Sequence, residues 1–240
     1  MEINDMNDEV EMQRRYYADK AERYDDAHVH EDDEHFFGLS FLEGVLEYLK
    51  ADSVLDVGSG TGRAMGYLMR HRPGLRVAGI EPVQELREVG YAQGIPKDCL
   101  LDGDATKLPY AAGEFDVVCA FGVLHHIRQP ELAIAEMLRV AGKAIFISDA
   151  NNFGRGSRLG RLMKQSINSL GLWKLAALVL SKGKGYVETP GDGISYSYSV
   201  FNNYRQIKQQ CRSVHLLNTT PGDINPYRSA SHVALLGIKK

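Results

Sequence analysis

A regular alternation of strand-like and helix-like segments is the feature of this sequence that most constrains its fold. Short runs rich in β-branched and apolar residues predict strands at residues 53–57, 76–80, 99–101, 115–121 and 144–148. Apolar residues that recur every three or four positions predict helices at residues 63–70, 83–92 and 130–140. Strands that are joined through helices form a mostly parallel sheet with helices on both faces. We therefore expect an α/β fold of the Rossmann-like, doubly wound kind.

Segments on either side of this alternation complete the expected sheet. Leucines with helical spacing predict a core-facing helix over residues 36–49. Residues 200–210 also resemble a helix, and two β-rich runs at residues 214–217 and 232–238 are separated by a loop of Pro, Gly and Asn. These two runs would close the sheet as an antiparallel pair, which gives seven strands with an antiparallel last strand.

Composition and charge divide the chain into four parts. Residues 1–35, with 4 basic and 13 acidic side chains, form an acidic N-terminal arm or helix, and residues 36–150 form the alternating core. Residues 151–199 contain many glycines and interrupt the alternation, so we expect a partly helical insertion there. Residues 200–240 hold the final helix and the closing strands of the main domain. Because residues 151–240 carry 13 basic and 3 acidic side chains, this part of the chain can face an anionic partner.

The overall composition excludes several classes of protein. With 240 residues, 44% of them hydrophobic, and a net charge of -3, the chain can bury a core without disulfides or metals. Its three cysteines are far apart and lack the spacing of metal ligands, so we expect neither a disulfide framework nor a metal site. The acidic N-terminus is unlike a signal peptide, and the longest apolar run, residues 175–180, is too short to cross a bilayer. We expect a cytoplasmic protein without a transmembrane segment.

A glycine-rich loop follows the first strand of the alternation. In the segment DVGSGTG, residues 56–62, the glycines allow the backbone to approach a ligand closely. A dinucleotide-binding fingerprint would need a small residue in place of Arg63, and a phosphate-binding P-loop would need Gly-Lys followed by Ser or Thr. The carboxylate of Asp56 would repel a phosphate and suits a ligand with a positive group.

Five phrases of the sequence, in this order and spacing, resemble the class I S-adenosylmethionine-dependent methyltransferases. VLDVGSGTG at 54–62 is similar to the first motif of that superfamily, and VAGIEP at 77–82 to its second strand. LDGDATKLPYAAGEFDVVCAFGVLHHI at 101–127 is similar to its third and fourth strands, and most of all to those of its small-molecule, methyltransferase type 11-like group. The resemblance covers residues 16–150 well and the last 40 residues loosely. It implies S-adenosylmethionine as the methyl donor, S-adenosylhomocysteine as the product, and no metal.

The resemblance assigns the methionine part of the cofactor to the glycine-rich loop. Gly58, Ser59 and Gly60 would lie against it, with backbone N–H groups donating to the cofactor's carboxylate. Asp56 would balance the ammonium group of the cofactor.

The nucleoside part of the cofactor is assigned to the ends of the next three strands. Glu81, followed by Pro82, would accept hydrogen bonds from both ribose hydroxyls. Asp104 would accept from the adenine amino group, and the backbone N–H of Ala105 would face the adenine ring. Phe121 would border the sulfur that carries the methyl group.

An aromatic segment near the N-terminus, YYADKAERYD at 16–25, resembles the part that many family members fold over the cofactor. Tyr16 or Tyr17, together with Tyr24, would close the pocket and bond the cofactor's carboxylate. Packing into the core is the alternative for these tyrosines.

The expected chemistry is methyl transfer to a small molecule, most simply to a hydroxyl of an anionic metabolite or sugar. A base that removes the proton of the hydroxyl helps this reaction, and His125 and His126 lie beside the expected methyl group. A structural role for both histidines stays open. The phrase AFGVLHH lacks the Asn/Asp-Pro-Pro-aromatic motif of enzymes that methylate exocyclic base amines. A methyltransferase directed at RNA or the ribosome and a non-catalytic cofactor-binding protein remain as alternatives, and a nucleic-acid partner is disfavoured.

The insertion combines basic and apolar residues in a way that allows three interpretations. It can be a lid over the active site with basic side chains toward an anionic acceptor, a segment that rests on an anionic membrane surface, or a helical hairpin packed on the sheet. Membrane contact is the least favoured of the three from the sequence alone. Between residues 155 and 184 there is no acidic residue, and seven basic ones are present: Arg155, Arg158, Arg161, Lys164, Lys174, Lys182 and Lys184.

Overall fold

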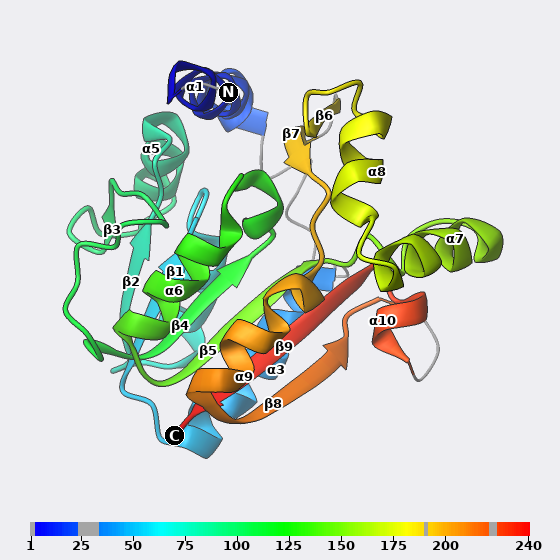
Figure 1. Ribbon diagram of the computed structural model, residues 1–240. Helices are drawn as coiled ribbons and strands as arrows, with labels where there is room; N and C mark the ends of the chain where they lie inside the picture. Colours follow the sequence, from blue (N-terminus) through cyan, green and yellow to red (C-terminus); the bar gives the residue numbers. More distant parts are fainter. Residues whose placement is uncertain (1–2, 24–33, 190–191, 221–224) are drawn as a thin grey trace.

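A single seven-stranded sheet organises the computed structural model, which describes residues 3–23, 34–189, 192–220 and 225–240. The strand order in this sheet is β3-β2-β1-β4-β5-β9-β8 (Figure 1). The strands are β1 (Ser53–Val57), β2 (Arg76–Ile80), β3 (Leu100–Leu101), β4 (Phe115–Phe121), β5 (Ala141–Ala150), β8 (Cys211–Asn218) and β9 (His232–Lys239). This arrangement confirms the expected Rossmann-like, doubly wound fold.

Strand direction places the carboxyl ends of the central strands along one edge of the sheet. β2, β1, β4 and β5 run parallel, whereas β9 is antiparallel to both of its neighbours, β5 and β8. β1 and β4 are neighbours in the middle of the sheet. The strands that follow β1 in the sequence, β2 and β3, lie on one side of this pair, and β5 lies on the other, so the strand order reverses between β1 and β4. Ligands of open α/β sheets bind at such a reversal point, beyond the carboxyl ends of the strands.

Helices cover both faces of the sheet and bury its apolar side chains. On one face α6 (Pro130–Val140) and α9 (Tyr204–Gln210) pack on β4, β5 and β9. On the other face α3 (Glu34–Leu49) and α4 (Arg63–His71) pack on β1, β4 and β5 with buried side chains such as Leu42 and Met65. α5 (Gln84–Ala92) lies beside β3. None of the helices in the described ranges has the length and apolarity needed to cross a membrane.

The remaining elements gather around the carboxyl edge and one side of the sheet. α1 (Ile3–Lys20) and the 3-10 turn η1 (Ala21–Arg23) lie over α5, and a further 3-10 turn, η2 (Leu124–His126), follows β4. The insertion contains α7 (Arg158–Ser169), α8 (Trp173–Leu180) and an antiparallel hairpin of β6 (Tyr186–Thr189) and β7 (Gly193–Tyr196). A 3-10 turn η3 (Val200–Asn203) precedes α9, and α10 (Pro226–Ser229) precedes β9.

Two of the differences from the expected element boundaries have clear physical reasons. The helix expected over residues 200–210 begins as η3, where the side chain of Ser199 accepts a hydrogen bond from the backbone N–H of Phe201. The strand expected at residues 144–148 extends over all of β5, because β4 pairs with its first residue, Ala141, and β9 pairs with its last, Ala150.

Candidate active site

A cavity of about 830 Å³ opens at the carboxyl ends of β1, β2 and β4. Its floor is formed by the loops after these strands, and α1 and β7 line it from the opposite side. Most of the site residues expected from the sequence line this cavity. They are Tyr17, Gly58, Gly60, Glu81, Pro82, Asp104, Ala105, Phe121 and His126.

The glycine-rich loop owes its shape to residues in the left-handed region of backbone conformation. Gly58 has φ +71° and Gly60 has φ +56°, values that L side chains rarely adopt. The backbone N–H groups of Gly58 and Ser59 donate to the carbonyl of Ile80 at 2.8 and 3.0 Å, which ties the loop to the end of β2. A Cβ atom on Gly58 would lie 2.5 Å from the Val123 side chain, so this position has no room for another residue.

Glu81 is a buried carboxylate at the rim of β2 that faces the cavity. One of its oxygens, Oε2, accepts the backbone N–H of Gly60 at 2.9 Å, and the other, Oε1, accepts the backbone N–H of Val83 at 2.9 Å. Burial raises the pKa of Glu81 to about 7, although both N–H groups and Arg87 act against this shift. The side chain is therefore fixed in place, with acceptor oxygens available to a ligand.

This pKa leads to a testable pH dependence of cofactor affinity. The prediction that Glu81 accepts from two ribose hydroxyls requires its charged form. Below pH 7 Glu81 becomes protonated and keeps one strong acceptor oxygen, so binding should weaken as the pH falls. We expect the affinity for S-adenosylhomocysteine, measured by calorimetry, to decrease about tenfold from pH 8 to pH 6. The variant Glu81→Gln should bind more weakly at pH 8 and should lose this additional pH dependence. An identical pH profile in the variant would assign the titration to another group.

Asp104 and Ala105 lie on the turn beyond β3 and line the cavity. The Oδ1 atom of Asp104 accepts hydrogen bonds from the backbone N–H and the hydroxyl of Thr106, both at 2.8 Å. These two bonds fix the carboxylate, while Oδ2 can accept from a ligand.

Asp56 and Ser59 belong to the glycine-rich loop, but their side chains are buried and they are not among the lining residues. Burial raises the pKa of Asp56 to about 6, against the opposing effects of Arg63, Cys119 and Ser59. The hydroxyl of Ser59 donates to the carbonyl of Asp56 at 2.9 Å. In this structure both residues hold the loop from within, and the balancing of a cofactor ammonium by Asp56 stays a prediction.

The three tyrosines expected over the cofactor have different positions. Tyr17 lines the cavity and its hydroxyl lies 2.9 Å from Nε2 of His126. Tyr16 packs instead on Gly193, where an added Cβ would lie 2.8 Å from the Tyr16 ring. Tyr24 lies outside the described residues.

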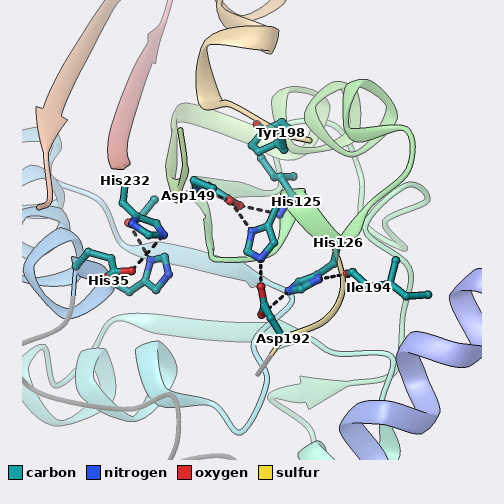
Figure 2. Close-up of polar contacts among 12 residues, drawn as sticks. His35, His125, His126, Asp149, Asp192, Ile194, Tyr198 and His232 are labelled. Carbon is teal, nitrogen blue, oxygen red and sulfur yellow. Dashed lines mark hydrogen bonds and ion pairs between the residues drawn. The ribbon is translucent and has the colours of Figure 1, made fainter. Parts of the chain in front are cut away.

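The two histidines of η2 belong to a connected polar network (Figure 2). His125 is bonded on both sides by carboxylates: its Nδ1 lies 2.7 Å from Asp149 and its Nε2 lies 3.2 Å from Asp192. Burial alone would lower the pKa of His125, but the two carboxylates outweigh it and raise this pKa to about 10. His125 is therefore a cation at neutral pH and does not line the cavity.

His126 is held differently and does line the cavity. Its Nδ1 lies 2.6 Å from the carbonyl oxygen of Ile194, which can only accept, and 3.1 Å from the amide nitrogen of Gln13. The shorter contact, with Ile194, favours the tautomer in which Nδ1 carries the proton. Its Nε2 lies 2.9 Å from the Tyr17 hydroxyl and 3.3 Å from Asp192. The contact with Ile194 therefore orients the ring, and it favours the tautomer in which Nε2 accepts from the Tyr17 hydroxyl.

His125, His126 and Asp192 also form a group that could hold a metal ion, the one such group found among the described residues. Their ligand atoms lie within 4.8 Å of one another. Each of these atoms is already paired with another member of the network, at 3.2 and 3.3 Å. The network is thus satisfied by hydrogen bonds and ion pairs alone, and the absence of a metal stays a prediction.

Sequence analysis missed two carboxylates of this network. Asp149 is fully buried at the end of β5 and accepts the backbone N–H of Leu124 at 2.8 Å, which positions η2. Its place directly after a predicted strand was the signal that could have identified it. Asp192, between two glycines, is one of three acidic residues in the basic last part of the chain. Its carboxylate has a pKa held below the usual range, because the two histidines outweigh the effect of burial.

A second group that was missed joins α1 to the far wall of the cavity. Glu9 is buried and accepts from Arg128 at 2.7 Å and from the Tyr196 hydroxyl at 2.6 Å. All three line the cavity. They connect segments far apart in the sequence, and no local pattern identifies them.

The insertion contributes to the cavity through its hairpin. Ile194 and Tyr196 of β7 are lining residues. The seven basic residues between 155 and 184 are not, so they do not face a ligand in this cavity.

Comparison with known proteins places this geometry in context. Residues 55–145 match a family described as "Methyltransferase domain". The norajmaline N-methyltransferase of Rauvolfia serpentina is 34% identical over 97 residues, which are 38% of this chain and 33% of that protein. The malonyl-[acyl-carrier protein] O-methyltransferase of Herminiimonas arsenicoxydans is 33% identical over 108 residues, or 44% of this chain and 40% of that protein. The chain thus spans between a third and two fifths of the length of these curated relatives.

Solved structures share the fold over nearly the whole chain. A methyltransferase of Thermotoga maritima, described as S-adenosylmethionine-dependent and a possible histamine N-methyltransferase, superposes with a TM-score of 0.59. The match covers 96% of this chain and 99% of that one, at 19% sequence identity. At this identity the likeness is one of fold.

Proposed function

The chain belongs to the class I S-adenosylmethionine-dependent methyltransferase superfamily, and on this premise we propose that it transfers a methyl group from S-adenosylmethionine to a small hydroxyl-bearing acceptor. The observation that carries the proposal is one cavity in which a buried carboxylate and a glycine-rich loop lie opposite a histidine whose ring is oriented by a backbone carbonyl.

The residues around the floor of the cavity fit this cofactor. Gly58 and Gly60 present backbone rather than side chains to the cavity, and Glu81 presents a buried carboxylate that suits a diol. Asp104 adds a fixed acceptor for an amino group. When bound, S-adenosylmethionine supplies a methyl group on a positively charged sulfur, which needs no further activation.

The chain's own part in the reaction is to align the acceptor and to remove its proton. His126 Nε2 would accept the proton of the acceptor hydroxyl as this oxygen takes up the methyl group. The Tyr17 hydroxyl, now paired with this Nε2, would give way to the acceptor. α1 and β7 line the cavity opposite the strand ends, where they would help to align the acceptor with the methyl group.

The charges that line the cavity support an uncharged acceptor. Arg128 is paired with Glu9 at 2.7 Å. Arg128 and Arg14 line the cavity together with four carboxylates, so the lining has no excess of positive charge. The basic residues of the insertion, which suggested an anionic acceptor, do not line the cavity. We therefore propose a neutral alcohol or sugar.

Radiolabelled S-adenosylmethionine tests this proposal. The purified chain is incubated with fractionated metabolite extract and, in parallel, with total RNA. We expect label in a neutral small molecule and none in RNA. Label in RNA would favour the alternative of an RNA-directed enzyme. Tight cofactor binding without labelled product in any fraction would favour a non-catalytic cofactor-binding protein.

A further inference from the structure

The helices α7 and α8 expose an unusually large amount of apolar surface. Neither helix contains a buried residue. Nine large apolar side chains on these helices and their connection are between 44% and 74% exposed. They are Leu159, Leu162, Met163, Leu170, Leu172, Leu175, Leu178, Val179 and Leu180. We call this set the leucine face.

Polar contacts and one aromatic ring attach the two helices to the rest of the molecule. On α7, Gln165 donates to the carbonyl of Phe153 at 2.9 Å, and Asn168 donates to the Tyr227 hydroxyl at 3.1 Å. On α8, Trp173 donates to the Ser197 hydroxyl at 2.9 Å, and its ring packs on that of Phe153. The inward side of α7 is thus its polar side, and α8 turns Trp173, Ala176 and Ala177 inward. The leucine face of both helices is directed outward.

This orientation distinguishes between the three interpretations of the insertion. A lid would place its leucines over the cavity, but no residue of the leucine face lines it. A hairpin packed on the sheet would bury its leucines, yet they are exposed. Figure 1 shows α7 and α8 projecting from the side of the molecule, beyond the sheet. A surface that binds an external apolar partner accounts for both observations.

Charge indicates what this partner is. Residues 155–184 include seven basic residues and no acidic one. Five of them, Arg155, Arg158, Lys174, Lys182 and Lys184, are exposed. A second copy of this surface would bring like charges together. The phosphates of RNA would attract the basic side chains but would leave the leucines in water. A bilayer with anionic lipids offers negative headgroups above an apolar interior, and so matches both properties.

We propose that α7 and α8 bind the surface of a membrane that contains anionic phospholipids. The leucine face enters the boundary between headgroups and acyl chains, while the aliphatic stems of Arg and Lys extend along it and their charged ends contact lipid phosphates. This binding site is independent of the proposed methyl transfer, and it is measured without turnover.

Vesicle sedimentation tests the proposal with the full chain. We expect the chain to bind vesicles of phosphatidylcholine with about one third phosphatidylglycerol at least about tenfold more strongly than pure phosphatidylcholine, and to be released by salt. Leu159→Ser together with Leu175→Ser should reduce binding at least about tenfold. R158E/K174E should reduce it to a similar extent.

Matched controls use exposed residues elsewhere on the molecule. R205E/K208E on α9 changes the net charge equally, and Leu216→Ser with Leu101→Ser removes two other exposed leucines. Both controls should keep binding within about twofold of the parent chain. Melting temperature and affinity for S-adenosylhomocysteine identify any variant that has lost its fold, and K182E/K184E then replaces R158E/K174E.

Three outcomes would overturn the proposal. One is sedimentation that is equal for the parent chain and the double-leucine variant. Another is binding to total RNA that depends on Arg158 and Lys174 while anionic vesicles are ignored. The third is self-association of the parent chain that the leucine variant abolishes without any change in vesicle binding.

Discussion

Replacing Gly58 by valine should abolish cofactor binding, with a loss in affinity of at least about a hundredfold by calorimetry with S-adenosylhomocysteine. The backbone of Gly58 has φ +71° and lines the cavity, and an added Cβ would lie 2.5 Å from Val123. Accommodating the side chain must displace the loop, including the Gly60 N–H that holds the Glu81 carboxylate at 2.9 Å. Loss of the two hydrogen bonds that Glu81 would accept from the ribose hydroxyls costs about 3 kcal/mol or more.

A control for this variant is available at Gly74. Its φ of +98° carries a similar strain for an L residue, but an added Cβ would meet no atom within 4 Å. Gly74→Val should lower the melting temperature by a few degrees and leave the affinity unchanged. Parent-like affinity in Gly58→Val would refute the assignment of the loop to the cofactor.

Replacing His126 by alanine should lower the rate of methyl transfer by about 10²-fold to 10⁴-fold, with little change in cofactor affinity. His126 lines the cavity with Nε2 able to accept a proton, whereas His125 is a buried cation between Asp149 and Asp192. Single-turnover measurements with the acceptor found by radiolabelling separate the chemical step from binding.

Two further histidine variants complete this test. His215→Ala removes an exposed histidine on β8 whose Nε2 lies 3.2 Å from the Ser213 hydroxyl, and should have the parent rate. His125→Ala leaves two carboxylates without their shared cation, so we expect a loss of stability before any specific loss of rate. Near-parent rates in His126→Ala would leave proximity alone as the source of catalysis.

The sequence was sufficient to predict the sheet and most of the cavity floor. β1, β2 and β4 begin and end where the apolar runs predict, because each is a short buried strand bounded by glycine or charged residues. Glu81 and Asp104 were assigned to the cofactor through the family resemblance. Both line the cavity, because the carboxyl ends of parallel strands meet at one edge.

The opposite wall of the cavity could not be predicted in the same way. This wall depends on contacts between α1, the turn after η2 and β7. Glu9, for example, contacts Arg128 and Tyr196, which lie 119 and 187 residues further along the chain. The direction in which the leucine face points could not be predicted from the sequence either. Helical spacing shows that leucines share one side of a helix, but polar anchors such as Gln165 and Trp173 decide which side turns outward.

The position of β9 has a consequence for how the chain is made. Residues Ala144–Ala150 of β5 pair with residues His232–Ile238 of β9, which the ribosome adds 82 or more residues later. At roughly 5–20 residues per second this delay lasts about 4–16 s. During that time β5, whose interior residues are fully buried in the finished protein, has one unpaired edge. Until β9 has been synthesised, this edge of β5 can pair with a strand of another chain. A chaperone or a low concentration of nascent chains would prevent such pairing.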